Sequence, residues 1–83
     1  MTKYIVQTAT AKMPRTVKAR YYRVAVLEVD DNMDRAAMIS TRARGVRRIV
    51  HLWDRVHGGS HGGNTAYDRA CREAADLCDR ANA

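Results

Sequence analysis

Arginine and histidine side chains are concentrated in one stretch of the chain, RARGVRRIVHLWDRVHGGSHGG, residues 42–63. A guanidinium group can bind phosphate or carboxylate oxygens in a bidentate manner, and a row of such groups can follow the backbone of a nucleic acid. The stretch therefore predicts contact with a nucleic acid or with another acidic partner. The residues expected to make this contact are Arg42, Arg44, Arg47, Arg48, His51 and Arg55.

Histidine and cysteine side chains in and after this stretch raise the question of a metal ion. His57 and His61 form an H-x3-H pair, and Cys71 and Cys78 follow seven residues apart. Zinc sites are usually built from closely spaced ligand pairs such as C-x2-C, which this pattern does not offer. We therefore expect no metal and no cofactor, and we expect both cysteines to be free, small apolar residues in the core.

Catalytic motifs are absent from the sequence. No nucleophile stands at a recognised spacing from a base, and the glycine-rich loop at 58–63 matches neither the P-loop nor the G-x-G-x-x-G pattern. The acidic residues between Glu28 and Asp34 follow a predicted strand, where a solvated turn is usual. These observations predict a protein that is not an enzyme.

Aromatic side chains offer a second kind of surface. Tyr21, Tyr22 and Trp53 belong to the residue types that most often dominate protein–protein interfaces. They are the candidate anchors for a protein partner, although the same rings could simply complete a hydrophobic core. A host protein is therefore the alternative to nucleic acid as the partner.

Size and composition limit these hypotheses further. The chain has 83 residues and a net charge of +6, which predict a single small globular domain, residues 1–83, with a preference for acidic partners. It contains no signal-peptide pattern and no apolar run of about 20 residues, so we expect a cytoplasmic protein that does not enter a membrane.

Two strands are expected in the first half of the chain. Residues 3–13 are rich in β-branched residues and end before Pro14, and residues 20–30 form the strongest strand pattern. Adjacent strands favour an antiparallel hairpin. Both faces of 20–30 are apolar, which predicts cover on both sides by helices and by a partner chain, so a homodimer is one possible assembly.

The segment 36–57 fits two elements. Its apolar residues Ile39, Ala43, Val46, Ile49, Val50, Trp53 and Val56 follow steps of 4, 3, 3, 1, 3 and 3. This spacing favours a helix that ends at Gly58–Gly59, at the cost of placing Gly45 in its interior. On that reading Arg44, Arg48, His51 and Arg55 share one side. A third strand, within 36–41 or over much of 36–57, is the alternative.

A final helix is expected over 65–82, capped by Asn64 or Thr65. One face of it carries Tyr67, Ala70, Cys71, Ala74, Leu77, Cys78 and Ala81. The expected fold is therefore α+β: an N-terminal antiparallel β-hairpin, with a third strand as an option, followed by one or two helices. The C-terminal amphipathic helix packs on the sheet.

Two motifs resemble landmarks of the plant AP2/ERF DNA-binding family: RGVRR, residues 44–48, and AYDRA, residues 66–70. In that family the first lies on the opening strand of a three-stranded sheet, and the second lies on the helix behind the sheet. Here only the 17 residues from 49 to 65 separate the motifs, too few for two further strands, and the expected strands precede RGVRR.

The size, composition and expected architecture also resemble small accessory proteins of phage genomes, including some anti-CRISPR proteins with a short sheet and helices. This resemblance implies a non-enzymatic protein that binds host or nucleic-acid machinery. The leading hypothesis is a basic module that contacts nucleic acid, or machinery bound to it, through its arginines. The alternative is a phage-type inhibitor or adaptor that binds a host protein.

Overall fold

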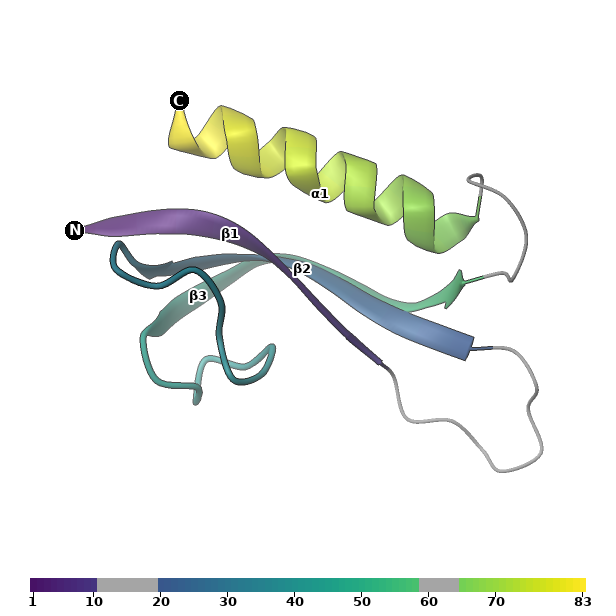
Figure 1. Ribbon diagram of the computed structural model, residues 1–83, viewed down its shortest axis with the longest axis horizontal. Helices are drawn as coiled ribbons and strands as arrows, with labels where there is room; N and C mark the ends of the chain where they lie inside the picture. The colour runs from purple at the N-terminus through teal and green to yellow at the C-terminus, as the bar shows by residue number, and fades with distance from the viewer. Residues whose placement is uncertain (11–19, 59–64) are drawn as a thin grey trace.

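The computed structural model describes residues 1–10, 20–58 and 65–83, which form a three-stranded antiparallel sheet and one helix (Figure 1). The elements are β1 (Thr2–Thr10), β2 (Arg20–Asp30), β3 (Val46–Gly58) and α1 (Ala66–Asn82), and the strand order is β1-β2-β3. The predicted α+β class, the N-terminal hairpin and the C-terminal helix packed on the sheet are confirmed.

β1 and β2 pair without any register shift, from Thr2 opposite Asp30 to Thr10 opposite Tyr22. The bounds predicted for the second strand, 20–30, match those of β2. The first strand ends at Thr10 in the described residues, and positions 11–13 of the prediction lie outside them. Because β2 is the central strand, its run of β-branched residues is paired on both edges.

The helix predicted over 36–57 is wrong, and the alternative, a third strand over much of this segment, is confirmed as β3. Between the pairs Arg20–Gly58 and Val29–Val46, β2 advances nine residues (29 − 20) and β3 advances twelve (58 − 46). β3 therefore contains three extra residues, one at each of the three register shifts. Each such bulge reverses the alternation of side chains, so apolar residues recur at spacings that resemble a helix.

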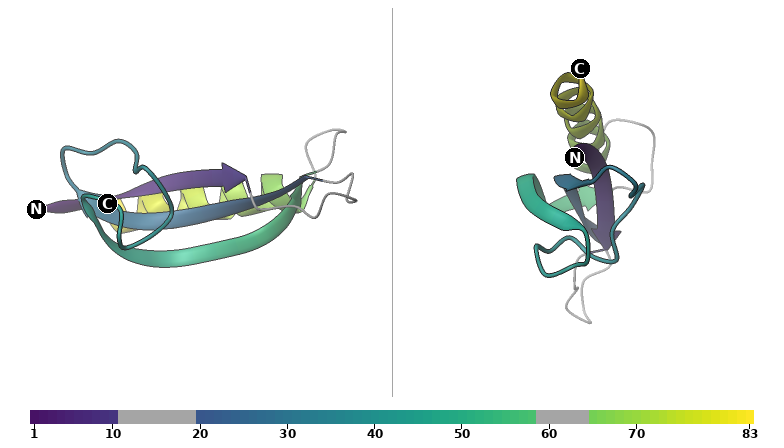
Figure 2. Two further views of the ribbon diagram at one scale, coloured as in Figure 1. Left: turned by 90° about the horizontal axis from the view of Figure 1, so that it is seen from below. Right: turned by 90° about the vertical axis from the view of Figure 1, so that its left-hand side faces the viewer.

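Both faces of the sheet are covered, as Figure 2 shows from the side and from one end. On one face, Val24 and Val26 of β2 pack with Ala70, Ala74 and Cys78 of α1. On the other face, the irregular segment 31–45 buries its own Ala36 and Ala43 against the strand residues Ala25, Leu27, Val29 and Val46. The predicted two-sided cover of β2 is thus provided within one chain, by a helix and by a segment with no regular structure.

The helix α1 begins with a capping box. Thr65 is the N-cap, its hydroxyl accepts the N–H of Asp68, and the Asp68 carboxylate accepts the N–H of Thr65. These hydrogen bonds lower the pKa of Asp68. The predicted apolar face is buried at Ala70, Ala74 and Cys78, while Ala81 is exposed. Among the described residues, no helix is long and apolar enough to cross a membrane.

Candidate functional site

The segment 31–45 is held against the sheet by specific contacts although it has no regular structure. The side-chain amide of Gln7 donates to the carbonyl of Ala36 at 2.9 Å and accepts the N–H of Ala36 at 3.2 Å. Lys3 forms an ion pair with Asp34 at 3.1 Å. Ala36 and Ala43 are buried, and Met33 and Ile39 pack against the same core, so the segment is attached by apolar side chains as well as by the Gln7 amide.

The end of this segment is a tight, hydrogen-bonded turn into β3. The N–H of Ala43 donates to the carbonyl of Ser40 at 3.1 Å, and the N–H of Val46 donates to the carbonyl of Ala43 at 3.2 Å. The Ser40 hydroxyl accepts the N–H of Arg42 at 3.1 Å. Gly45 has a φ of 81°, a left-handed conformation that favours glycine, and its carbonyl accepts the N–H of Asp30.

This turn displays arginines toward solvent. Arg42 and Arg44 are exposed on either side of the buried Ala43, so the backbone between them is fixed while both guanidinium groups remain outside. Neither has an ion-pair partner among the described residues, and the same is true of the exposed Arg35 in the same segment. Arg35 was not predicted as a site residue. Its only signal in the sequence is its position among the polar residues after the second strand.

Arg47 and Arg48, the first two arginines of β3, are instead paired with carboxylates of β2. Arg47 contacts Asp30 at 2.7 Å and Arg48 contacts Glu28 at 3.3 Å. Both arginine side chains remain more than half exposed, at 65% and 62%. The carboxylates are less exposed, at 35% for Asp30 and 23% for Glu28, but both guanidinium groups face solvent, so an incoming phosphate can compete for either of them.

The predicted row of Arg44, Arg48, His51 and Arg55 does not form, because it required a helix. Arg44 precedes β3, and Arg48 and Arg55 lie seven residues apart on the strand, roughly 23 Å if it is fully extended. Arg55 is exposed and has a φ of 54°. It lies in the bulge opposite Arg23, which pairs with Asp54 at 2.9 Å. Of the arginines predicted to make the contact, Arg42, Arg44, Arg47 and Arg48 thus lie in the turn and at the start of β3, with Arg55 apart from them.

The predicted protein-contact anchors have neighbours within the fold. Tyr22 packs against Tyr67 with a ring separation of 4.5 Å, and Tyr21 contacts His57. The Trp53 indole donates to Glu73 at 3.2 Å and packs with the helix-side core. All three anchors remain half-buried.

An open groove of about 340 Å³ runs between β3 and α1, beside the indole of Trp53. The expected contact residue His51 lies there, with its ring 4.2 Å from that of Trp53. The remaining lining residues are Glu73, Asp76, Leu77 and Arg80. His51 is therefore grouped with α1 and separated from the arginines of the turn.

The histidines and cysteines do not gather in the described part of the chain. Within residues 1–10, 20–58 and 65–83, no three His, Cys, Asp or Glu side chains are placed to hold a metal ion. His61 and the glycine-rich loop from Gly59 onward lie outside the described residues. Both cysteines are free, as predicted; Cys71 is half-buried, and Cys78 is buried with its thiol donating to the carbonyl of Tyr4 at 3.0 Å. Burial raises the pKa of the Cys78 thiol.

Of the two motifs that resemble the AP2/ERF family, one lies on the element expected in that family and the other does not. AYDRA opens α1, behind the sheet, but RGVRR leads into the third strand and not the first. Comparison of the chain with protein-family models, curated proteins and solved structures finds no match. The arginine-bearing turn is therefore interpreted from its own geometry.

Proposed function

We propose that this chain is a non-enzymatic, basic binding module that contacts nucleic-acid phosphates with the arginines of the turn. The observation that carries the proposal is the pair Arg42 and Arg44. Both are exposed and unpaired among the described residues, and both extend from a backbone fixed by the buried Ala43. An ordered backbone lowers the entropic cost of binding, because only the side chains must be immobilised.

The neighbouring arginines support the same surface to different degrees. Arg35 is exposed and unpaired within the described residues, so its charge is available without breaking a contact. Arg47 and Arg48 must first exchange Asp30 and Glu28 for a phosphate. Arg42 and Arg44 are therefore expected to contribute more to binding than Arg47 and Arg48.

The test is fluorescence anisotropy with labelled duplex DNA and duplex RNA across about 50 to 200 mM salt. Each phosphate contact contributes roughly 0.9 to the slope of log affinity against log salt concentration. The Arg42→Ala/Arg44→Ala variant is therefore expected to lower that slope by about 2, and Arg48→Ala by less than 1.

A matched control removes the same charge elsewhere. Arg69→Ala/Arg80→Ala also subtracts two positive charges, but from α1 on the opposite face of the sheet from the turn. The proposal requires the control to keep most of the wild-type slope. Equal losses in both double variants would mean that only net charge matters, and absence of binding at 50 mM salt would refute the nucleic-acid proposal.

The alternative proposal, a phage-type inhibitor or adaptor that binds a host protein, predicts a different pattern. Losses would then be concentrated at one or two aromatic anchors, such as Trp53, and would change little with salt. The ring of Trp53 already packs with the helix-side core and that of Tyr22 already contacts Tyr67, which favours the arginine surface as the first one to test.

A further inference from the structure

The two edges of the sheet differ in how well they are protected against pairing with another strand. An unpaired edge is a template for strand addition, and proteins usually disrupt it with charges or bulges. β3 has both: three register shifts, together with Arg47, Arg48 and Arg55. β1 has no register shift, and its residues from Tyr4 to Thr10 carry no charge. The edge of β1 is therefore the one open to a further strand.

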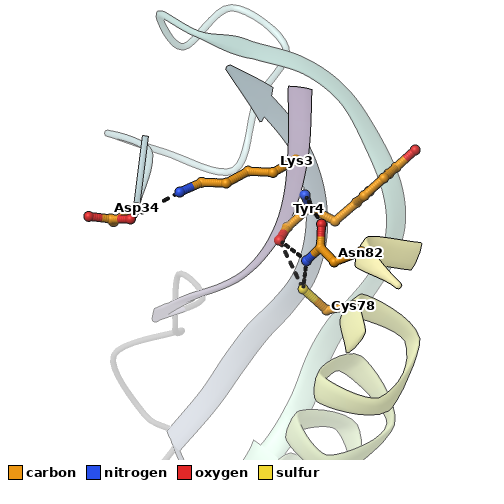
Figure 3. Close-up of polar contacts among 5 residues, drawn as sticks. All are labelled: Lys3, Tyr4, Asp34, Cys78 and Asn82. Atoms are coloured by element: carbon orange, nitrogen blue, oxygen red, sulfur yellow. Dashed lines mark hydrogen bonds and ion pairs between the residues drawn. The ribbon is translucent and has the colours of Figure 1, made fainter. Parts of the chain in front are cut away.

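A contact at one end of β1 identifies which of its backbone groups point outward (Figure 3). The side-chain amide of Asn82 accepts the N–H of Tyr4 at 2.9 Å and donates to the carbonyl of Tyr4 at 2.8 Å. The amide thus makes the two hydrogen bonds that a neighbouring strand would make. On the opposite edge, the carbonyl of Met1 accepts the N–H of Asp31, which agrees with odd-numbered residues facing β2.

Because the N–H and C=O groups of successive residues point to opposite sides of a strand, those of Val6, Thr8 and Thr10 point the same way as those of Tyr4. Among the residues that the structure describes, none hydrogen-bonds to these outward groups. Asn82 covers only Tyr4. A five-residue length of edge, from Val6 to Thr10, therefore remains uncovered by the described residues.

We propose that this edge pairs with β1 of a second copy of the chain, in antiparallel orientation, to form a continuous six-stranded sheet. The register follows from leaving the Asn82–Tyr4 contact intact. Val6 then lies opposite Thr10 of the partner subunit, and Thr8 lies opposite Thr8 of the partner subunit. Each of the three outward-facing pairs exchanges two hydrogen bonds, so the interface contains about six.

The geometry of the chain favours its own copy as the occupant. The paired segment is uncharged and meets itself about a two-fold axis, so no like charges face each other, and directly opposed threonines are a favourable cross-strand pair. That axis is perpendicular to the sheet, which places both helices on the same face. α1 contacts all three strands and reaches the outer edge of β1 at Asn82, beside Tyr4, which lies four residues or about 13 Å along the strand from the two-fold axis at Thr8.

The dimer does not depend on the proposed nucleic-acid contact, because the arginine turn covers a face of the sheet and not the β1 edge. The first measurement is sedimentation equilibrium of the wild-type chain over a range of concentrations. The expected result is a reversible monomer–dimer equilibrium. A wild-type chain that stays monomeric up to hundreds of micromolar would overturn the proposal.

The variant Thr8→Lys tests the position of the interface. Thr8 is exposed, and the substitution places two ammonium groups directly opposite each other across the two-fold axis, which should abolish the dimer. Thr2→Lys is the matched control, because it makes the same change on the same edge outside the paired segment. Circular dichroism of both variants shows whether the monomer is still folded. The proposed register would be contradicted if both variants were equally monomeric, or if both still formed the dimer.

Cross-linking tests the register in a second way that does not rely on disrupting the dimer. In Thr8→Cys, the two thiols lie on residues whose Cα atoms are about 5.5 Å apart, within disulfide range. A copper–phenanthroline oxidant, which accepts the two electrons, should therefore produce covalent dimers. In Thr10→Cys the two sites are offset by four residues, about 13 Å, and should not cross-link. The wild-type chain gives the background from Cys71, and preferential cross-linking of Thr10→Cys would refute the register.

Discussion

Gly45 is the residue whose substitution tests the turn most directly. It combines a φ of 81° with close packing, since a Cβ added there would overlap the sulfur of Met33. Gly45→Ala therefore has two separate costs. A non-glycine residue in the left-handed region costs about 1–2 kcal/mol, and displacing the end of the flexible, half-buried Met33 side chain adds at most about 1 kcal/mol, the low end of the cost of extra volume. The free energy of unfolding should fall by about 1–3 kcal/mol.

The two costs can be separated by a double-mutant cycle with Met33→Ala, measured by urea unfolding monitored through Trp53 fluorescence. In the Met33→Ala background the steric cost disappears, and Gly45→Ala should cost only about 1–2 kcal/mol. Gly45→Asn should be less destabilising than Gly45→Ala, because asparagine tolerates the left-handed region better. A cost unchanged by Met33→Ala would show that the overlap is not the cause, and equal costs for Asn and Ala would show that φ is not.

Two further predictions concern α1. Thr65→Ala removes the capping box and should cost about 1 kcal/mol, or about 4–8 °C in Tm, whereas the exposed Thr41→Ala should cost close to nothing. The pKa of Asp68 is lowered in the folded state. The capping box therefore stabilises the fold fully above the ordinary carboxyl pKa of 3.8, and this stabilisation is lost as the pH falls through the lowered pKa. The difference in unfolding free energy between wild type and Thr65→Ala should therefore shrink in acid. Burial raises the pKa of Cys78, so its contribution is present below the ordinary thiol pKa of 9.0 and is lost as pH rises through the raised value. Wild type should thus lose more stability than Cys78→Ala as the pH rises above 9.0, and parallel curves for the two chains would refute the role of the buried thiol.

The elements that could be predicted from the sequence are those specified by local signals. Thr65 and Asp68 form the capping box from residues three positions apart, and the apolar face of α1 repeats without interruption. β2 is a run of β-branched and small residues that is buried on both faces, so any reading of its alternation gives a strand. In both elements, the information needed lies within the element itself.

The segment 31–45 could not be predicted because its contacts are long-range. Gln7 reaches Ala36 across 29 residues of sequence, and the buried side chains of the segment are alanines, which leave no hydrophobic period. The candidate site could be predicted only in part, for the same reason: its contacts are also long-range. The arginines could be identified by type, but the pairing of Arg47 with Asp30 and Arg48 with Glu28 depends on the register of β3.

The failure at β3 and the difference between the sheet edges have one physical cause. Three extra residues shift the alternation of β3, so its apolar side chains Val46, Ile49, Val50, Trp53 and Val56 follow a helix-like spacing while filling both faces of the sheet. The same bulges interrupt the regular spacing of its outer backbone groups, which makes β3 a poor template for another strand. β1 was predicted from its β-branched residues, and because it contains no bulge, its outer backbone groups keep the regular spacing that another strand can pair with. In this chain, the helix-like apolar spacing of β3 therefore marks the protected edge of the sheet, and the regular strand β1 forms the edge that can pair with another strand.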